Sequence, residues 1–262
     1  MKRTFLVTLL FGLLAAALAH AEAPSGITRP SNERQLSDPQ LGAQLYAGNC
    51  ASCHGVAGEG VTGRGSGRDT GNISGKGPSL KGVGKRAADF YIRTGYMPLL
   101  SPYDQPWRRR VLFTRREQNA LINYVAKLGG GPPVPKPAPE RGHLAEGLRL
   151  FTEHCAGCHQ VAAEGGYVTD FRVPTLKRAT PTQIAEAVRI GPYVMSKFSE
   201  KAISNRQLDS IIAYIQASKQ PQDRGGWGIG HIGPVPEGII AWLVAAFVLV
   251  GLCALIGERI RA

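Results

Sequence analysis

Two segments of the chain carry apolar residues at helical spacing. One contains Leu121, Ile122, Tyr124 and Val125, and the other contains Ile211, Ile212, Tyr214 and Ile215. Each is preceded in the sequence by a segment in which a glycine stands four positions before an aromatic residue: Gly42 before Tyr46, and Gly147 before Phe151. Such residues share a helix face, where the glycine would let another helix approach closely and the aromatic would fill the crossing. The pattern predicts two helical units of one design, and therefore an all-α fold.

Two longer apolar segments lie outside these units. Residues 5–19 are apolar and follow a basic start, and Ala19-His20-Ala21 fits a cleavage site, which together are the pattern of a cleaved signal peptide at 1–21. About 15 apolar residues are short for a membrane span, although an uncleaved anchor remains the alternative. Residues 238–257 carry no charge and would form a transmembrane helix of about 30 Å. Arg259 and Arg261 follow, which predicts a cytoplasmic C-terminus and places both helical units outside the cell (plasma) membrane.

Proline and glycine divide the 262-residue chain between these elements. Residues 129–140 form a Pro-rich linker, which is expected to be a stiff spacer. Residues 221–237 are rich in Gly and Pro and join the second unit to the membrane segment. We therefore expect the first unit at 34–128 and the second at 141–220. Within the first unit, Gly-rich residues 55–77 predict an extended loop.

Each unit carries the pattern Cys-x-x-Cys-His, from Cys50 to His54 and from Cys155 to His159. Thiols three positions apart fall on one face of a helical turn, where they can form thioethers with the two vinyl groups of one haem. The adjacent histidine is then an axial ligand of the iron. Two redox dithiols or one four-cysteine zinc site are alternatives, but histidine follows the second cysteine both times. The sequence predicts two covalently bound haem c groups, attached through Cys50, Cys53, Cys155 and Cys158 and ligated by His54 and His159.

A methionine follows each motif at a similar place in its unit, Met97 in the first and Met195 in the second. Thioether sulfur is the usual second axial ligand of cytochromes c and raises the reduction potential. We therefore predict that Met97 and Met195 complete the coordination of the two irons. The rival ligands are three histidines outside the motifs: His143, His154 and His231.

Composition limits the partners that the chain could have. The formal net charge is +12 before the two propionates of each haem are counted. A basic chain can bind nucleic acid, but no recognised motif supports that here. Acidic proteins and anionic lipid headgroups fit the charge better. Four of the five cysteines belong to the haem motifs and the fifth, Cys253, lies in the apolar segment, so none remains for a disulfide framework.

The two units resemble class I cytochrome c domains in tandem. The segments Gly225-Gly226-Trp227 and Gly233-Pro234-Val235-Pro236-Glu237-Gly238 then precede a single C-terminal membrane helix. This order resembles the dihaem cytochrome c subunit of the actinobacterial-type cytochrome bcc complex, a bc1-like quinol–cytochrome c reductase. In class I domains a proline carbonyl holds the ligand histidine, which the resemblance assigns to Pro78 and Pro174.

The resemblance implies a role in electron transport. Such a subunit works beside a cytochrome b subunit and takes electrons from the Rieske iron–sulfur subunit. It passes them to a cytochrome aa3-type oxidase. Both irons are expected to be six-coordinate, so the chain would conduct electrons in the respiratory chain without a catalytic residue of its own.

Three other functions remain as alternatives. A dihaem peroxidase would need an iron with an open position, which a methionine after each motif argues against. The cytochrome subunit of another membrane dehydrogenase usually carries three haems. The dihaem subunit of a cbb3-type oxidase would place its membrane segment before the haem domains.

One charged run has no assigned role. Arg108, Arg109 and Arg110 are consecutive and follow Trp107, inside an insertion at 98–113. They form either a solvated loop, with possible pairing to haem propionates, or a docking surface for carboxylates or lipid phosphates.

Overall fold

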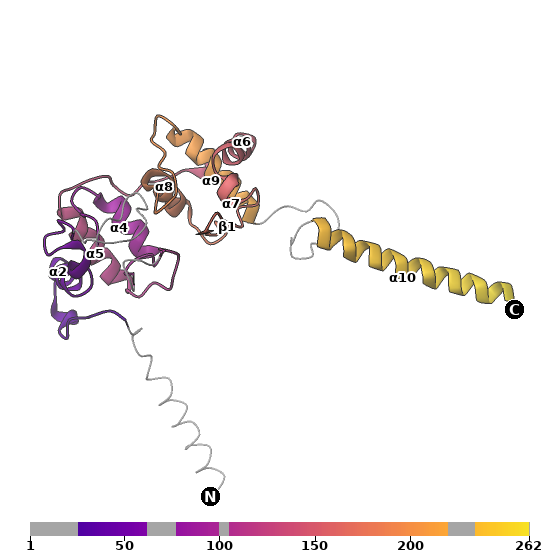
Figure 1. Ribbon diagram of the computed structural model, residues 1–262, viewed down its shortest axis with the longest axis horizontal. Helices are drawn as coiled ribbons and strands as arrows, with labels where there is room; N and C mark the ends of the chain where they lie inside the picture. The colour runs from indigo at the N-terminus through magenta and orange to yellow at the C-terminus, as the bar shows by residue number, and fades with distance from the viewer. Residues whose placement is uncertain (1–25, 62–76, 100–104, 220–233, 262) are drawn as a thin grey trace, which may run out of the picture. The chain divides into compact units, whose positions relative to one another are not determined.

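The computed structural model describes residues 26–61, 77–99, 105–219 and 234–261 (Figure 1). Residues up to Ile215 belong to one compact body and Gln216–Ala262 to a second, and each is described by itself. The predicted signal peptide at 1–21 lies outside the described residues, as do most of the Gly-rich loop and of the juxtamembrane segment.

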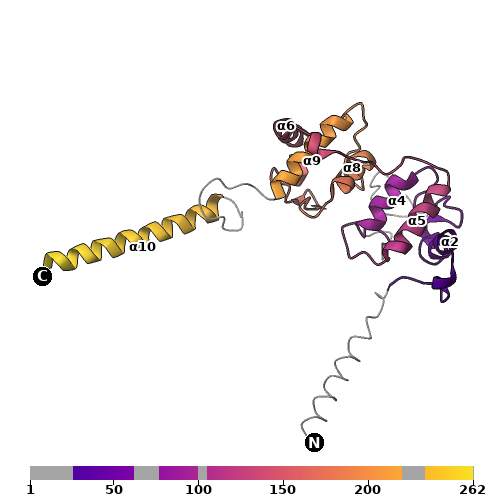
Figure 2. The ribbon, with the colours of Figure 1, turned by 180° about the vertical axis from the view of Figure 1, so that it is seen from behind.

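The described residues of the first helical unit form four α-helices. They are α2 (Asp38–Asn49), α3 (Ala51–His54), α4 (Gly84–Arg93) and α5 (Arg115–Lys127), preceded by the short 3-10 helix η1 (Glu33–Gln35). Helices α2 and α5 lie side by side in both views (Figures 1 and 2). A β-carbon on Gly42 would overlap the backbone carbonyl of Ala120, so only glycine permits this close crossing. Tyr46 fills the crossing and is 1% exposed.

A buried carboxylate fixes the start of α5. The backbone N–H of Thr114 donates to Glu117 Oε2 at 2.5 Å, and the N–H of Glu117 donates back to Thr114 Oγ1 at 3.3 Å. This reciprocal cap satisfies backbone donors that the first helical turn leaves free. Arg29 Nε donates to Glu117 Oε1 at 2.6 Å, which ties the N-terminal segment to the same carboxylate. Burial raises the pKa of Glu117, but the hydrogen bonds from Arg29 and Thr114 outweigh it and hold that pKa below its usual range.

The second helical unit repeats the design. Its elements are η2 (Pro139–Arg141), α6 (Leu144–His154), α7 (Ala156–His159), β1 (Gly166–Val168), β2 (Phe171–Val173), α8 (Pro181–Ile190) and α9 (Asn205–Lys219). Phe151 packs at the crossing of α6 and α9, with its ring centroid 5.3 Å from that of Tyr214. The all-α expectation holds for both units, with one addition: β1 and β2 form a small antiparallel hairpin just before Pro174.

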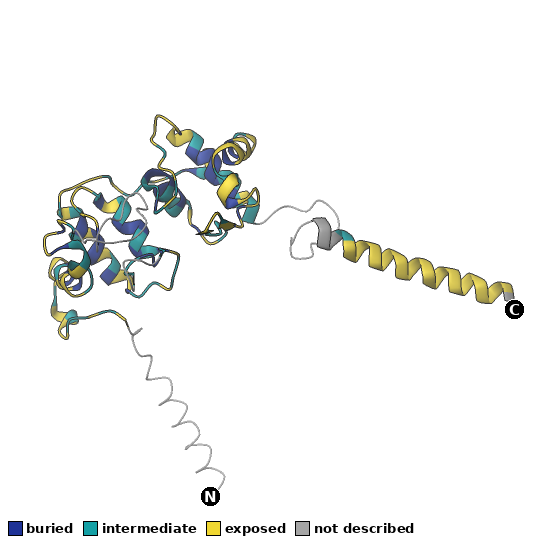
Figure 3. Cartoon of the chain, in the orientation of Figure 1, coloured by how far each residue is buried: buried dark blue, intermediate teal, exposed yellow. Residues whose placement is uncertain are grey.

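Each unit has its own apolar core, and the two units also touch. Figure 3 shows the buried residues on the inward faces of the helices in both units. Helix α4 of the first unit packs against α8 of the second. Glu186, at 0% exposed, and Asp89, at 8%, are both buried acidic residues of these two helices. The contact between units is therefore a packed one with acidic groups inside it.

The second body contains the helix α10 (Pro234–Arg261). Within it, Gly238–Ile260 is long and apolar enough to cross a membrane, and none of this span is buried. Its large apolar side chains face outward, including Trp242 at 80% exposed and Phe247 at 76% (Figure 3). A helix that is apolar all round and uncovered needs a lipid environment. The structure thus provides a candidate transmembrane helix where the sequence predicts one.

Candidate functional site

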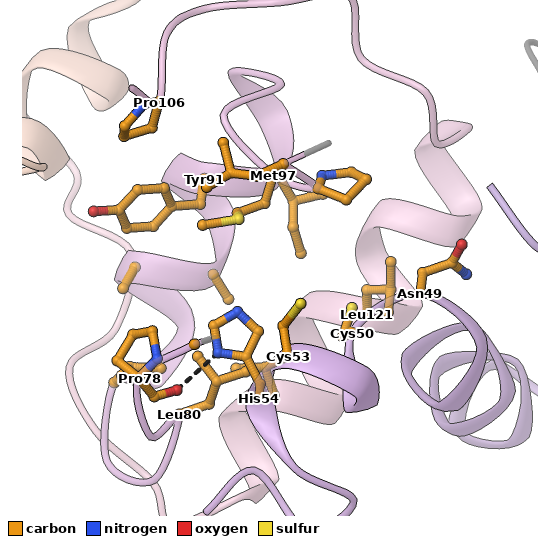
Figure 4. Close-up of a pocket in the computed structure, with 18 of the residues that line it drawn as sticks. Asn49, Cys50, Cys53, His54, Pro78, Leu80, Tyr91, Met97, Pro106 and Leu121 are labelled. Atoms are coloured by element: carbon orange, nitrogen blue, oxygen red, sulfur yellow. Dashed lines mark hydrogen bonds between the residues drawn. The ribbon is translucent and has the colours of Figure 1, made fainter. Parts of the chain in front are cut away.

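A cavity of about 420 Å³ lies inside the first helical unit, and the residues of the first motif open into it (Figure 4). Cys50, Cys53 and His54 line one side, and Met97 lines another. The remaining wall is mainly apolar, with Leu80, Ile92, Phe113, Leu121 and Val125 among its residues. A cavity of this size and lining suits a large, mostly apolar group that bonds to sulfur and nitrogen atoms of the protein.

The short helix α3 sets the direction of the motif's side chains. Helix α2 ends at Asn49, and Cys50 turns the chain with φ −125° and ψ −36° before α3 begins. The N–H of His54 donates to the carbonyl of Cys50 at 2.9 Å, which closes one helical turn. The sulfurs of Cys50 and Cys53 thereby reach the same side of the cavity (Figure 4). This is the arrangement needed for two thioethers to one porphyrin.

A backbone carbonyl orients the imidazole of His54. Its Nδ1 lies 2.7 Å from the carbonyl oxygen of Pro78, as the dashed line in Figure 4 shows. A carbonyl oxygen only accepts, so Nδ1 carries the hydrogen and Nε2 keeps its lone pair. Burial lowers the pKa of His54, with the Pro78 contact opposing the shift, and the imidazole therefore stays neutral. A neutral ring with Nε2 free is the form that binds iron.

Met97 faces this imidazole from across the cavity (Figure 4). The N–H of Met97 donates to the carbonyl of Tyr91 at 3.1 Å, which holds the segment after α4 against that helix. His54 and Met97 thus lie on opposite walls, as two axial ligands of one metal would.

The second helical unit has a matching cavity of about 210 Å³. Cys155, Cys158, His159 and Met195 all line it. Cys155 has the same backbone angles as Cys50, φ −125° and ψ −36°. His159 Nδ1 lies 3.1 Å from the carbonyl oxygen of Pro174, and burial likewise lowers the pKa of His159. The structure therefore brings every predicted haem-binding residue of each unit to one cavity.

The rival histidines are placed differently. His143 precedes α6, where its Nε2 lies 3.4 Å from Arg206 Nη2, and it does not line either cavity. His154 does line the second cavity, but its ring packs on Phe198 with centroids 5.9 Å apart. His231 lies outside the described residues.

Residues of each helical unit also line the cavity of the other unit. Tyr193 of the second unit and Pro106 of the first line both cavities. Phe90, Tyr96 and Arg108 of the first unit line the second cavity. The run of three arginines marks Arg108 in the sequence, but no sequence signal marks the other residues, because their role depends on how α4 and α8 pack.

Comparison with known proteins finds two family models that match different parts of the chain. Residues 39–129 match the sequence model of the family described as cytochrome c. Residues 142–215 match the one described as cytochrome c oxidase, cbb3-type, subunit III. The cytochrome bc1 complex cytochrome c subunit of Corynebacterium diphtheriae is 32% identical over 263 residues, covering 94% of this chain and 89% of that protein. Its namesake from Mycobacterium tuberculosis H37Rv is 32% identical over 264 residues, covering 97% of this chain and 90% of that protein.

The chain belongs to the family of cytochrome bc1 complex cytochrome c subunits. As a member of this family it has two cytochrome c domains, which are the two helical units, and it carries two covalently bound haem c groups. It is an electron-transport protein anchored in a membrane. A more distant relative, the cbb3-type cytochrome c oxidase subunit FixP of Sinorhizobium medicae, is 29% identical over 167 residues. That match covers 58% of this chain and 52% of FixP.

Proposed function

We propose that this subunit relays electrons from the Rieske iron–sulfur subunit of a quinol–cytochrome c reductase to a terminal cytochrome aa3-type oxidase. The observation that carries the proposal is the pair of adjoining cavities, which share Pro106 and Tyr193 as wall residues. Two haems held in these cavities would form a chain for outer-sphere electron transfer. Homology to bc1 complex subunits along nearly the whole chain supports the same role.

The proposal assigns ligands to each iron. His54 and Met97 hold the first haem, and His159 and Met195 hold the second. Thioethers join Cys50 and Cys53 to the first haem and Cys155 and Cys158 to the second. The haem supplies a reversible one-electron iron couple, and the protein residues fix its ligands and exclude water. Met97 faces His54 across the first cavity, and Met195 lines the second cavity together with His159. A methionine ligand at each iron would leave no open position for a substrate, which supports conduction and argues against a peroxidase.

The proposed topology follows from charge and length. The haem domains would lie on the extracytoplasmic side, after a signal peptide at 1–21, with the C-terminus in the cytoplasm. Arg259 and Arg261 directly follow the apolar part of α10, and basic residues favour the cytoplasmic side. We also propose a cytochrome b subunit as the neighbour that α10 packs against.

Gentle detergent extraction tests the assignment. A tagged chain should co-purify with a cytochrome b, a Rieske protein and an aa3-type oxidase, and added quinol should reduce both haems in that preparation. The control is the same preparation inhibited at the quinol site, in which the two haems should stay oxidised. A second candidate function is that of a cytochrome c subunit of a cbb3-type oxidase, which the match of residues 142–215 to the cbb3-type family favours. Recovery of a cbb3-type oxidase without cytochrome b would support this second function instead.

A further inference from the structure

The three consecutive arginines have different surroundings, so they do not form one uniform charged surface. Arg110 is exposed. Arg109 stacks on Trp107, with its guanidinium carbon 5.1 Å from the ring centroid. Arg108 is half-buried and lines the cavity of the second helical unit, although it belongs to the first. Only Arg108 therefore reaches a haem site.

The charge of Arg108 is not neutralised by its protein partner. Its Nη1 and Nη2 donate to Gln183 Oε1 at 3.2 and 3.1 Å, and a glutamine amide carries no charge. Burial lowers the pKa of Arg108, Tyr96 opposes this shift, and nearby Arg178 adds to it. Within the part of the chain that the structure describes, no carboxylate forms an ion pair with Arg108. A partly buried cation is stabilised by an anionic partner, and none of the described residues supplies one.

The two cavities differ in charge. The described residues lining the second cavity include Arg108 and Arg172 and no Asp or Glu. Those lining the first include no Asp, Glu, Lys or Arg at all. The second cavity is therefore complementary to an acidic ligand, and the haem of a cytochrome c brings two propionate carboxylates with it. Arginine suits them because its planar fork pairs with a carboxylate through two hydrogen bonds.

We propose that Arg108, supplied by the first helical unit, binds a propionate of the second haem and raises the reduction potential of that haem. Arg172 contributes a second positive charge to the same wall. This inference deepens the proposed function and rests on its haem sites. Reduction adds one electron near the guanidinium, so a cation in this weakly screened pocket favours the reduced form. Electrons arriving at the first haem would thus be drawn toward the second by a residue of the first unit.

The test is a spectroscopic redox titration of the intact dihaem protein. We expect Arg108→Gln to lower the reduction equilibrium constant of the second haem about three- to tenfold, where tenfold is about 59 mV for one electron. The first haem should keep its potential. Arg108→Lys should retain most of the wild-type value because it keeps the charge. Arg110→Gln is the matched control and should change neither potential.

Two further measurements distinguish a wrong role for Arg108 from a wrong assignment of the haem ligands. Met97→Ala should lower the potential of the first haem, which identifies that haem; if it moves neither potential, the ligand assignment itself is wrong. If Met97→Ala acts as expected but Arg108→Gln leaves both potentials unchanged, the role of Arg108 is refuted. If Arg108→Gln does not load the second haem, infrared spectroscopy of the wild-type protein tests the contact directly. One propionate of the second haem should then titrate below the usual carboxyl range of about 4, because pairing with the guanidinium favours its ionised form. Two propionates that both titrate in the usual range would overturn the proposal.

Discussion

Gly147 of α6 lies directly against the backbone carbonyl of Ser210 in α9, and a β-carbon at this glycine would overlap that oxygen. The obstacle is backbone, so it cannot move aside as a flexible side chain would. We predict that Gly147→Ala lowers the free energy of unfolding by about 1–3 kcal/mol, the usual cost of overpacking. Denaturant unfolding of the detergent-solubilised protein, followed by haem absorbance, measures the change.

The control for this substitution is Gly157→Ala. Gly157 lies inside the second haem motif, where an added β-carbon would meet nothing within 4 Å. Ser52 occupies the same place in the first motif, so a side chain is tolerated there. Equal stability of the Gly147→Ala variant and the wild type would show that α6 and α9 cross less closely than described.

Replacing each proposed methionine ligand should affect one haem at a time. Loss of thioether ligation lowers the reduction potential, because sulfur stabilises the reduced iron. Met97→Ala should therefore lower one potential and Met195→Ala the other, while both haems remain covalently attached. Redox titration of the two variants and their double mutant measures this. Both substitutions acting on the same haem would contradict the assignment of one methionine to each iron.

Because Glu186 is buried, we predict that the stability of the folded protein depends on pH. Burial, with the nearby carboxylate of Asp89, raises the pKa of Glu186 from 4.5 to about 9, while Arg93 and Arg86 oppose the rise. The folded protein thus keeps Glu186 protonated where the unfolded chain has lost that proton. The contribution of Glu186 to the free energy of unfolding is therefore fully present below about pH 4.5 and is lost as the pH rises toward about 9.

We expect Glu186→Gln to flatten that fall in stability, since glutamine does not titrate. Unfolding midpoints in urea measured between about pH 5 and 9 would show it. Glu153→Gln is the control, because Glu153 is exposed and, among the described residues, pairs with its helix neighbours Arg149 and His154. An unchanged pH profile in the Glu186→Gln variant would mean that the folded state does not hold the extra proton.

Removing residues 238–262 should release the haem domains from the membrane. The apolar surface of α10 is uncovered in the structure, so its loss removes the main reason for membrane association. We predict a soluble product that carries two haems and is recovered outside the cytoplasm. Fractionation with haem staining measures it. If the product stays in the membrane fraction, residues 5–19 act as an uncleaved anchor.

Sequence alone predicts the parts of this protein that depend on local chemistry. The haem motifs are read from neighbouring residues, and α10 from an uninterrupted apolar run. The burial of Glu186 and the reach of Arg108 could not be predicted, because both depend on the packing of α4 against α8. The β1–β2 hairpin was also missed. Its turn residues Thr169 and Asp170 have φ of 38° and 69°, and glycine or asparagine is the usual sign of such a turn.

The pairing of α2 with α5 has a consequence for how the protein is made. The first helix of the unit packs on its last, so the core cannot close until the chain is available as far as Lys127. Domains fold as whole units, so Cys50 and Cys53 stay accessible until α5 docks on α2. The order of the helices along the chain thereby leaves both thiols open to haem attachment before the core closes.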